Sequence, residues 1–224
     1  MTTLPSDGAS LEPLQLRSTP ELIADRLRAE ILSGAFQPDA QLSEVALATQ
    51  LKVSRGPIRE AMQRLIQEGL LRAERNRGVF VVELDEVDAR DVYLARSAVE
   101  RTAAEIVTTA ADGATFDELE RVLDQMAEAE GHDWTELIGH DLAFHQTLVD
   151  AAGSPRLTRM FRTLIAETRL CMLRLEPFYG ERGEVLAEHR GILDAIRSGD
   201  QETVDRLVRV HMEVSASRLS PAGE

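Results

Sequence analysis

The chain has 224 residues, 43% of them apolar, which is enough to bury a core in one large domain or two small ones. Its formal net charge of -14 excludes a passive nucleic-acid coat and a basic membrane-surface protein, because both need an excess of Lys and Arg. The charge is uneven, however, since residues 50–80 hold seven basic and three acidic side chains. A local positive patch is therefore expected on an acidic protein.

Residues 1–16 contain several Pro, Gly and Ser residues and no Lys or Arg, and we expect a disordered N-terminal extension there. No apolar run is long enough for a membrane-spanning helix or a signal peptide. The single cysteine, Cys171, fits a reducing compartment. We therefore expect a cytoplasmic protein with no membrane partner.

The next segment, residues 17–82, combines three short helices with two strands. Apolar residues at three- and four-residue spacing predict helices over about 18–33, 43–51 and 54–69. Ser54 is a favourable N-cap for the third helix, and Pro57 lies in its first turn, where its missing N–H costs little. Two strands, 70–72 and 79–82, are joined by a basic tip at 73–78. The pattern predicts a winged helix-turn-helix with a two-stranded wing.

No further strand pattern follows residue 85, and residues 86–218 are predicted to form an all-α bundle of about six helices. Thr115 and Glu118 have the spacing of a capping box at the start of the second of these helices. The fold class is thus mainly α, with two domains. The six helices are expected at about 86–110, 115–130, 134–152, 155–176, 184–197 and 201–218.

The third helix carries the chemistry of DNA recognition. Arg55 and Arg59 are four residues apart, so they share an outward face near the helix N-terminus, where guanidinium groups can pair with guanine edges. Other cations and backbone groups nearby can contact phosphates. An ordinary solvated charged face is the alternative. The candidate DNA contacts are Ser54, Arg55, Gly56, Arg59, Arg64, Arg75, Arg77 and Gly78.

The run Ser54-Arg55-Gly56-Pro57-Ile58-Arg59-Glu60-Ala61, with Glu68-Gly69-Leu70 and Asn76-Arg77-Gly78-Val79-Phe80-Val81, closely resembles the winged-helix domain of GntR-family transcription regulators. The resemblance covers residues 18–82. It implies that Arg55 and Arg59 contact bases and that Ser54, Gly56 and Gly78 lie near the DNA backbone. The family usually has Pro-Gly where this chain has Pro38-Asp39. Many members have a phosphate-contacting Arg where Val45 stands, so we expect the wing to carry more of the DNA contact here.

Four residues of the second domain have the pattern of a metal site. Asp141 and His145 are four residues apart and share one helix face. His189 lies eleven residues before Asp200 and His211 eleven after it, so an antiparallel hairpin places both at the same height. Such a set suits zinc, nickel, manganese or iron without distinguishing them. Helix packing or surface positions are the alternative for each histidine. His132 and His140 are excluded, the first by its Gly-Asp turn and the second by its helix face.

The helical domain resembles the effector domain of the FadR-type branch of the GntR family, called the FCD domain. The matching residues include Arg96-Ser97-Ala98-Val99-Glu100, Asp141-Leu142-Ala143-Phe144-His145, Glu188-His189 and His211-Met212. The resemblance implies a divalent metal on Asp141, His145, His189 and His211, and a small carboxylate effector. Arg96 is the candidate partner of that carboxylate because a guanidinium matches it bidentately, with a salt bridge to Glu100 as the alternative. Arg169 is a second, weaker candidate.

Together the two domains predict a homodimeric, ligand-responsive transcription regulator, a repressor, that binds double-stranded DNA at a palindromic operator. A small organic acid is its expected effector. One alternative is a regulator that senses the metal itself. A metal-dependent phosphohydrolase of the His-Asp type is a more distant one, suggested only by His140-Asp141, and we see no general base for it. We therefore expect no catalytic residues and no enzyme activity.

Overall fold

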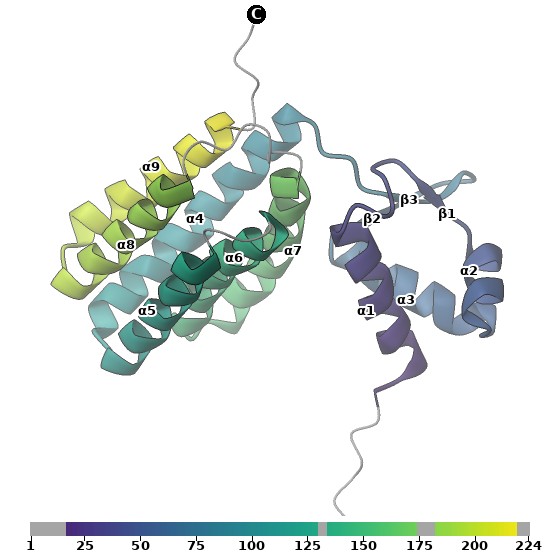
Figure 1. Ribbon diagram of the computed structural model, residues 1–224, viewed down its shortest axis with the longest axis horizontal. Coiled ribbons are helices and arrows are strands. Elements are labelled where there is room, and N and C mark those ends of the chain that lie inside the picture. The colour runs from purple at the N-terminus through teal and green to yellow at the C-terminus, as the bar shows by residue number, and fades with distance from the viewer. Residues whose placement is uncertain (1–16, 130–133, 174–181, 219–224) are drawn as a thin grey trace, which may run out of the picture.

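The computed structural model describes residues 17–129, 134–173 and 182–218, and the predicted extension at 1–16 lies outside them. Figure 1 shows an N-terminal part at the right and a helical bundle at the left. The mainly α fold, with three helices before the wing and six after it in the described residues, is confirmed. The N-terminal part holds α1 (Thr19–Leu32), β1 (Gln41–Leu42), α2 (Glu44–Leu51), α3 (Arg55–Gln67), β2 (Leu71–Glu74) and β3 (Gly78–Val81). The bundle holds α4 (Glu86–Ala110), α5 (Gly113–Glu128), α6 (Trp134–Ala151), α7 (Pro155–Leu173), α8 (Arg182–Ser198) and α9 (Gln201–Arg218).

Local side-chain hydrogen bonds fix where the first two helices begin. The Ser18 hydroxyl accepts from the Glu21 N–H, and the Glu21 carboxylate accepts from the Ser18 N–H, which makes a capping box for α1. The Ser43 hydroxyl accepts from the Ala46 N–H at the start of α2. Lys52 ends α2 in the left-handed region at φ 55°. This residue turns the chain sharply into α3.

The wing contains one strand more than the sequence predicts. Among the described residues β1, β3 and β2 form an antiparallel sheet in that order, with Gln41 opposite Phe80 and Arg72 on the other side of Phe80. The prediction of a two-stranded wing was therefore incomplete. At two residues, β1 is too short to show the apolar alternation that identifies a strand. It ties the loop after α1 to the base of the wing.

In the bundle, α4 is the central helix and packs against α6, α7, α8 and α9. Its buried positions recur every three or four residues, and two of them are Arg96 and Glu100. The predicted capping box of Thr115 and Glu118 is wrong. Asp112 caps α5 instead, because its carboxylate accepts from the N–H groups of Ala114 and Thr115, so the helix begins at Gly113.

The two parts touch along α7. Ala166 and Leu170 of α7 pack against the apolar core of the N-terminal part, which includes Ile31, Leu70 and Val81. At the end of α3, Gly69 has a φ of 77°, and a Cβ on it would lie 3.1 to 3.3 Å from side-chain atoms of α7. Figure 1 shows α7 on the side of the bundle nearest the N-terminal part. The helix α7 therefore packs both against the other helices of the bundle and against the N-terminal part.

Candidate metal centre and nucleic-acid interface

The four residues predicted as metal ligands come together in the interior of the bundle. Asp141 and His145 come from α6, His189 from α8 and His211 from α9. One ligand atom from each can be chosen so that all four atoms lie within 4.8 Å of one another. Each residue is buried, at 4% exposed or less. The hairpin of α8 and α9 turns at Gly199, whose φ is 75°, and it brings His189 and His211 level with each other.

In each histidine the Nδ1 atom faces an acceptor. Nδ1 of His145 lies 2.5 Å from Oε2 of Glu100, and Nδ1 of His211 lies 2.7 Å from Oε2 of Glu188. Nδ1 of His189 lies 2.7 Å from the Val185 carbonyl oxygen. Each Nδ1 therefore donates its proton, and in the neutral ring Nε2 is left with a free lone pair. This arrangement of outer partners is the one that metal-binding histidines use.

The three Nε2 atoms point at one another. Nε2 of His145 lies 3.1 Å from Nε2 of His189 and 3.3 Å from Nε2 of His211. Oδ1 of Asp141 lies 3.3 Å from Nε2 of His189. Atoms that bind one ion at about 2.1 Å lie roughly 3 Å from each other, so the spacing fits a bound cation. Without a cation, these lone pairs would repel each other.

Burial keeps two of these rings neutral. Desolvation lowers the pKa of His145 well below its ordinary value, and the nearby Arg96 charge acts in the same direction. Desolvation together with the charge of His211 lowers the pKa of His189 to about 4. Near neutral pH, His145 and His189 are therefore in the neutral form that binds metals. The buried Phe144 ring packs against both rings in T-shaped contacts, with centroids 5.6 Å from that of His145 and 4.9 Å from that of His189.

Arg96 is joined to this cluster through Glu100. Its Nε donates to Oε1 of Glu100 at 2.8 Å, while Oε2 of the same carboxylate binds His145. The salt bridge that the sequence left as the alternative is therefore present. The NH2 nitrogen of Arg96, however, is buried without a hydrogen-bond partner in the part of the chain that the structure describes. A buried donor of this kind can still bind an anion.

The other residues that the sequence weighed lie elsewhere. Arg169 is on α7, whereas the cluster comes from α6, α8 and α9; its Nε is buried with no hydrogen-bond partner among the described residues. His140 is on α6 one position before Asp141 and is partly exposed, outside the cluster. His132 lies outside the described residues. The sequence did not predict a role for Glu188, although this residue directly precedes His189. It predicted Glu100 only as a partner of Arg96.

The two candidate base-contacting arginines lie together on the exposed face of α3. Arg59 is 65% and Arg55 is 59% exposed, and both bind Glu44 of α2. Nε and NH2 of Arg59 lie 3.0 and 2.9 Å from the Glu44 carboxylate, and NH2 of Arg55 lies 3.0 Å from it. Hydrogen bonds from Arg59 and then Arg55 lower the pKa of Glu44 to about 2. Glu44, which sequence analysis did not single out, thus holds both guanidinium groups in one orientation.

The start of α3 offers groups for a phosphate. Ser54 occupies the N-cap position, but within the described residues its side chain makes no capping hydrogen bond, which leaves the hydroxyl available. A Cβ placed on Gly56 would have no heavy atom within 4 Å outside its own helix turn and chain neighbours. The backbone of the DNA could therefore approach the helix closely at this position. The free N–H groups and the dipole of a helix N-terminus favour an anion here.

The wing presents its basic tip to solvent. Arg75 and Arg77 are exposed, and Arg77 forms an ion pair with Glu74 and lies over the Phe80 ring. Gly78 has a φ of 122°, a backbone conformation that side chains other than glycine rarely adopt, so this position favours glycine. Arg64 lies at the other end of α3, half-exposed, 3.5 Å from Glu21.

Comparison with known proteins identifies this combination of domains. A family model described as bacterial regulatory proteins, gntR family, matches residues 19–81, and the FCD domain model matches residues 91–214. The HTH-type transcriptional regulator YdhC of Bacillus subtilis is 31% identical over 199 residues, which cover 87% of this chain and 88% of that protein. The chain belongs to the gntR family.

Two further relatives of this gntR-family chain cover most of its length. The gluconate operon transcriptional repressor of Bacillus licheniformis is 29% identical over 84% of this chain and 80% of its own. A putative transcriptional regulator GntR from Rhodococcus sp. RHA1 has a crystal structure that matches with a TM-score of 0.77. That structure is 30% identical and covers 92% of this chain and 99% of its own. The chain is a transcription regulator and not an enzyme, so the phosphohydrolase alternative is set aside.

This gntR-family chain departs from the usual family sequence at two positions that the structure describes. Asp39 has a φ of 62°, a left-handed conformation that suits the glycine usual there and that Asp tolerates. Val45 of α2 is 56% exposed, which is unusual for a large apolar side chain. In the described residues, no helix is long and apolar enough to cross a membrane.

Proposed function

We propose that this protein is a homodimeric repressor that binds an operator in double-stranded DNA through residues 17–82 and responds to a small organic acid through residues 86–218. The mutual orientation of the three Nε2 atoms carries the metal and effector part of the proposal. The gluconate operon repressor, which aligns with most of the chain, supports the assignment as a repressor.

For DNA, we assign base contacts to Arg55 and Arg59. Their exposure and their shared orientation on Glu44 suit two guanidinium groups that enter a major groove together. Ser54, Gly56, Arg64, Arg75, Arg77 and Gly78 are assigned to the phosphates on either side. In a two-fold dimer, the helix-turn-helix parts of the two chains (the DNA-binding heads) contact successive half-sites, so the operator should be palindromic.

For the metal, we assign Asp141, His145, His189 and His211 as ligands of one zinc, nickel, manganese or iron ion. Three imidazole nitrogens and one carboxylate suit any of these ions. The bound ion would supply a positive charge and open positions that accept a carboxylate oxygen. Glu100 and Glu188 orient His145 and His211 for this task.

For the effector, we assign Arg96 as the main partner of its carboxylate. The NH2 nitrogen is buried and unpaired among the described residues, and an anionic oxygen would satisfy it. Arg169 is the second candidate, with its own unpaired Nε. The acid then changes the affinity for DNA only if it binds one arrangement of the two DNA-binding heads more tightly than the other. The size of the change is set by that difference in affinity.

Two experiments test this function. A selection of duplexes from a random DNA pool with the full-length protein should enrich a two-fold repeated sequence; no enrichment would contradict the DNA-binding assignment. A thermal-shift screen of small organic acids on protein of known metal content should find an acid that raises Tm, because a ligand of the native state stabilises it. If metal alone changes operator affinity and no acid does, the protein is a metal sensor instead.

A further inference from the structure

The start of α2 presents a large apolar side chain beside the charged groups of α3. Val45 is 56% exposed, and its neighbour Glu44 binds Arg55 and Arg59 at 2.9 to 3.0 Å. Figure 1 shows α2 on the side of the N-terminal part that is away from the bundle, so the bundle of the same chain does not cover Val45. An exposed apolar side chain therefore directly follows the residue that holds both candidate base-contacting arginines.

The helix fixes the position of Val45. Leu47 and Ala48, on another face of α2, are buried in the core of the N-terminal part, which sets the rotation of the helix. The Thr49 hydroxyl donates to the Val45 carbonyl oxygen at 2.9 Å. A β-branched side chain in a helix has essentially one χ1 rotamer. The two methyl groups of Val45 are thus held in one place, which lowers the entropy cost of a contact with a partner.

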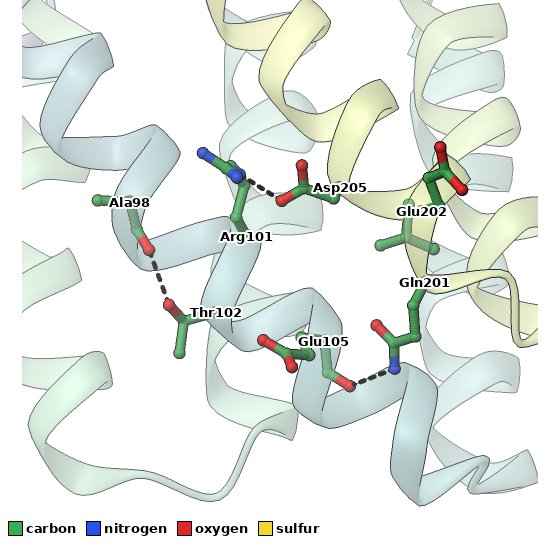
Figure 2. A pocket seen from close by; sticks show the side chains of 8 residues that line it. Ala98, Arg101, Thr102, Glu105, Gln201, Glu202 and Asp205 are labelled. Atoms are coloured by element: carbon green, nitrogen blue, oxygen red, sulfur yellow. Dashed lines mark hydrogen bonds and ion pairs between the residues drawn. The ribbon is translucent and has the colours of Figure 1, made fainter.

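The arginines beside Val45 differ from an arginine that is paired within the bundle. Figure 2 shows Arg101 in a hollow of about 580 Å³ between α4 and α9, where its Nε lies 2.5 Å from Oδ1 of Asp205. The side chain of Arg101 is 40% exposed, whereas those of Arg55 and Arg59 are 59% and 65% exposed. The two arginines of α3 therefore keep more of their surface open to an external partner.

The edges of DNA base pairs offer different chemistry to these side chains. In the major groove, guanine presents two acceptors that suit a guanidinium, and the apolar group within reach of a side chain is the 5-methyl group of thymine. A valine placed against a polar base edge would cover a donor or acceptor without satisfying it. Beside two arginines, Val45 is therefore complementary to a thymine that neighbours a guanine.

We propose that Val45 is a specificity-determining residue that contacts the 5-methyl group of one thymine in each half-site, next to the guanine contacted by Arg55 or Arg59. This inference rests on the base contacts of the proposed function and adds the recognition of a second base. Glu44 joins the two contacts, because its carboxylate positions both guanidinium groups one residue before Val45. Each half-site of the operator should then contain a thymine directly beside a guanine.

Deoxyuridine, which lacks the 5-methyl group of thymidine, tests this contact. Each thymine of the selected operator is replaced in turn, in both half-sites together, and fluorescence anisotropy gives the dissociation constant of the full-length protein. At one thymine beside a guanine, the replacement should weaken binding about fourfold for each half-site, as expected when one methyl group stays in water. The loss over both half-sites is then about 15-fold.

Val45→Ala should remove the preference for the methyl group. This variant should bind the thymine operator more weakly than the unaltered protein does, and it should distinguish thymine from deoxyuridine by less than about twofold. Because the side chain is exposed, the substitution leaves the fold intact, which circular dichroism checks. Val87→Ala is the matched control, since it makes the same change at a valine of α4 that is 70% exposed, and it should keep the full preference.

A duplex with 5-methylcytosine gives the converse test. Cytosine at the same position lacks the methyl group, and 5-methylcytosine carries it on the same ring carbon as thymine. The unaltered protein should bind the 5-methylcytosine duplex about fourfold per half-site more tightly than the cytosine duplex. Val45→Ala should bind both duplexes equally. A general loss of folding or of DNA affinity in the variant would lower both dissociation equilibria together and cannot produce this pattern.

The results separate this inference from the function on which it rests. If the selection enriches no operator, or if Arg59→Ala has no effect on it, the base contacts of the proposed function are wrong and the Val45 contact fails with them. If an operator is found but no thymine responds to deoxyuridine, or if Val45→Ala responds as the unaltered protein does, only the Val45 contact is wrong. Methyl effects that disappear in Val45→Ala and persist in Val87→Ala support both.

Discussion

Nε2 of His145 lies 3.1 Å from Nε2 of His189, and in both rings the Nδ1 atom is already bound to an acceptor. Two neutral imidazoles that meet in this way direct lone pairs at each other, which is unfavourable in a buried site. A cation between them turns the repulsion into coordination. The relationship therefore supports a metal centre more strongly than the presence of histidines alone.

Removal of one ligand should abolish metal binding. His145→Gln keeps a side chain that can donate to Glu100 but lacks the imidazole nitrogen, so metal content should fall from about one ion per chain to nearly none. Elemental analysis of the purified protein measures it. His140→Gln, one position before Asp141 on the same helix and outside the cluster, is the control and should keep its metal. Equal metal content in both variants would falsify the ligand assignment.

The outer partner of His211 should tune metal affinity. Glu188→Ala removes the carboxylate that binds Nδ1 of His211, and the dissociation constant for metal should rise about 10- to 100-fold. Glu184→Ala is the matched control, since Glu184 lies one turn earlier on α8, is 64% exposed and approaches Arg218. Competition with a chelator measures both affinities. If the two variants bind metal equally well, Glu188 has no orienting role.

Loss of one recognition arginine should weaken specific DNA binding. Arg59→Ala should cost about 1 to 3 kcal/mol of affinity for the selected operator and relax the preference at one base pair. Arg156→Ala removes an exposed cation from α7 and controls for net charge. Fluorescence anisotropy with operator and mutated duplexes measures both effects. An unchanged affinity for Arg59→Ala, or an equal loss for Arg156→Ala, would reject the base contact.

The contact between α3 and α7 can be isolated with two glycines. Gly34 and Gly69 both have a φ of 77°, but a Cβ meets nothing within 4 Å at Gly34 and meets Glu167 and Thr163 at Gly69. Alanine at either position costs about 1 to 2 kcal/mol for the left-handed backbone. Gly69→Ala should therefore lower Tm more than Gly34→Ala does. Equal losses in calorimetry would show that α7 does not press on this turn.

The sequence predicts those features that depend on periodicity or on fixed spacing. The apolar repeat locates the helices of both parts, and helix phase with hairpin symmetry locates His145 and His189 correctly within one cluster. Each of these follows from the geometry of a single helix or of one helical hairpin. They need no knowledge of how distant segments pack.

Other features depend on tertiary contacts that no local pattern records. The strand β1 exists only because Gln41 and Leu42 pair with β3. Glu44 binds Arg55 and Arg59 across a helix-turn-helix angle, and Glu188 binds His211 on the next helix. At the start of α5 two capping patterns compete, and Asp112 prevails over Thr115. Single-sequence reasoning has no means of ranking such alternatives.

We propose that the metal-bound bundle changes the DNA affinity of the helix-turn-helix parts when an organic acid binds. The most direct measurement is the dissociation constant of the selected operator for metal-loaded protein, with and without the organic acid that raises Tm most. We predict a change of about 5- to 150-fold, the usual size of coupling between two sites. An identical dissociation constant at saturating acid would contradict the account.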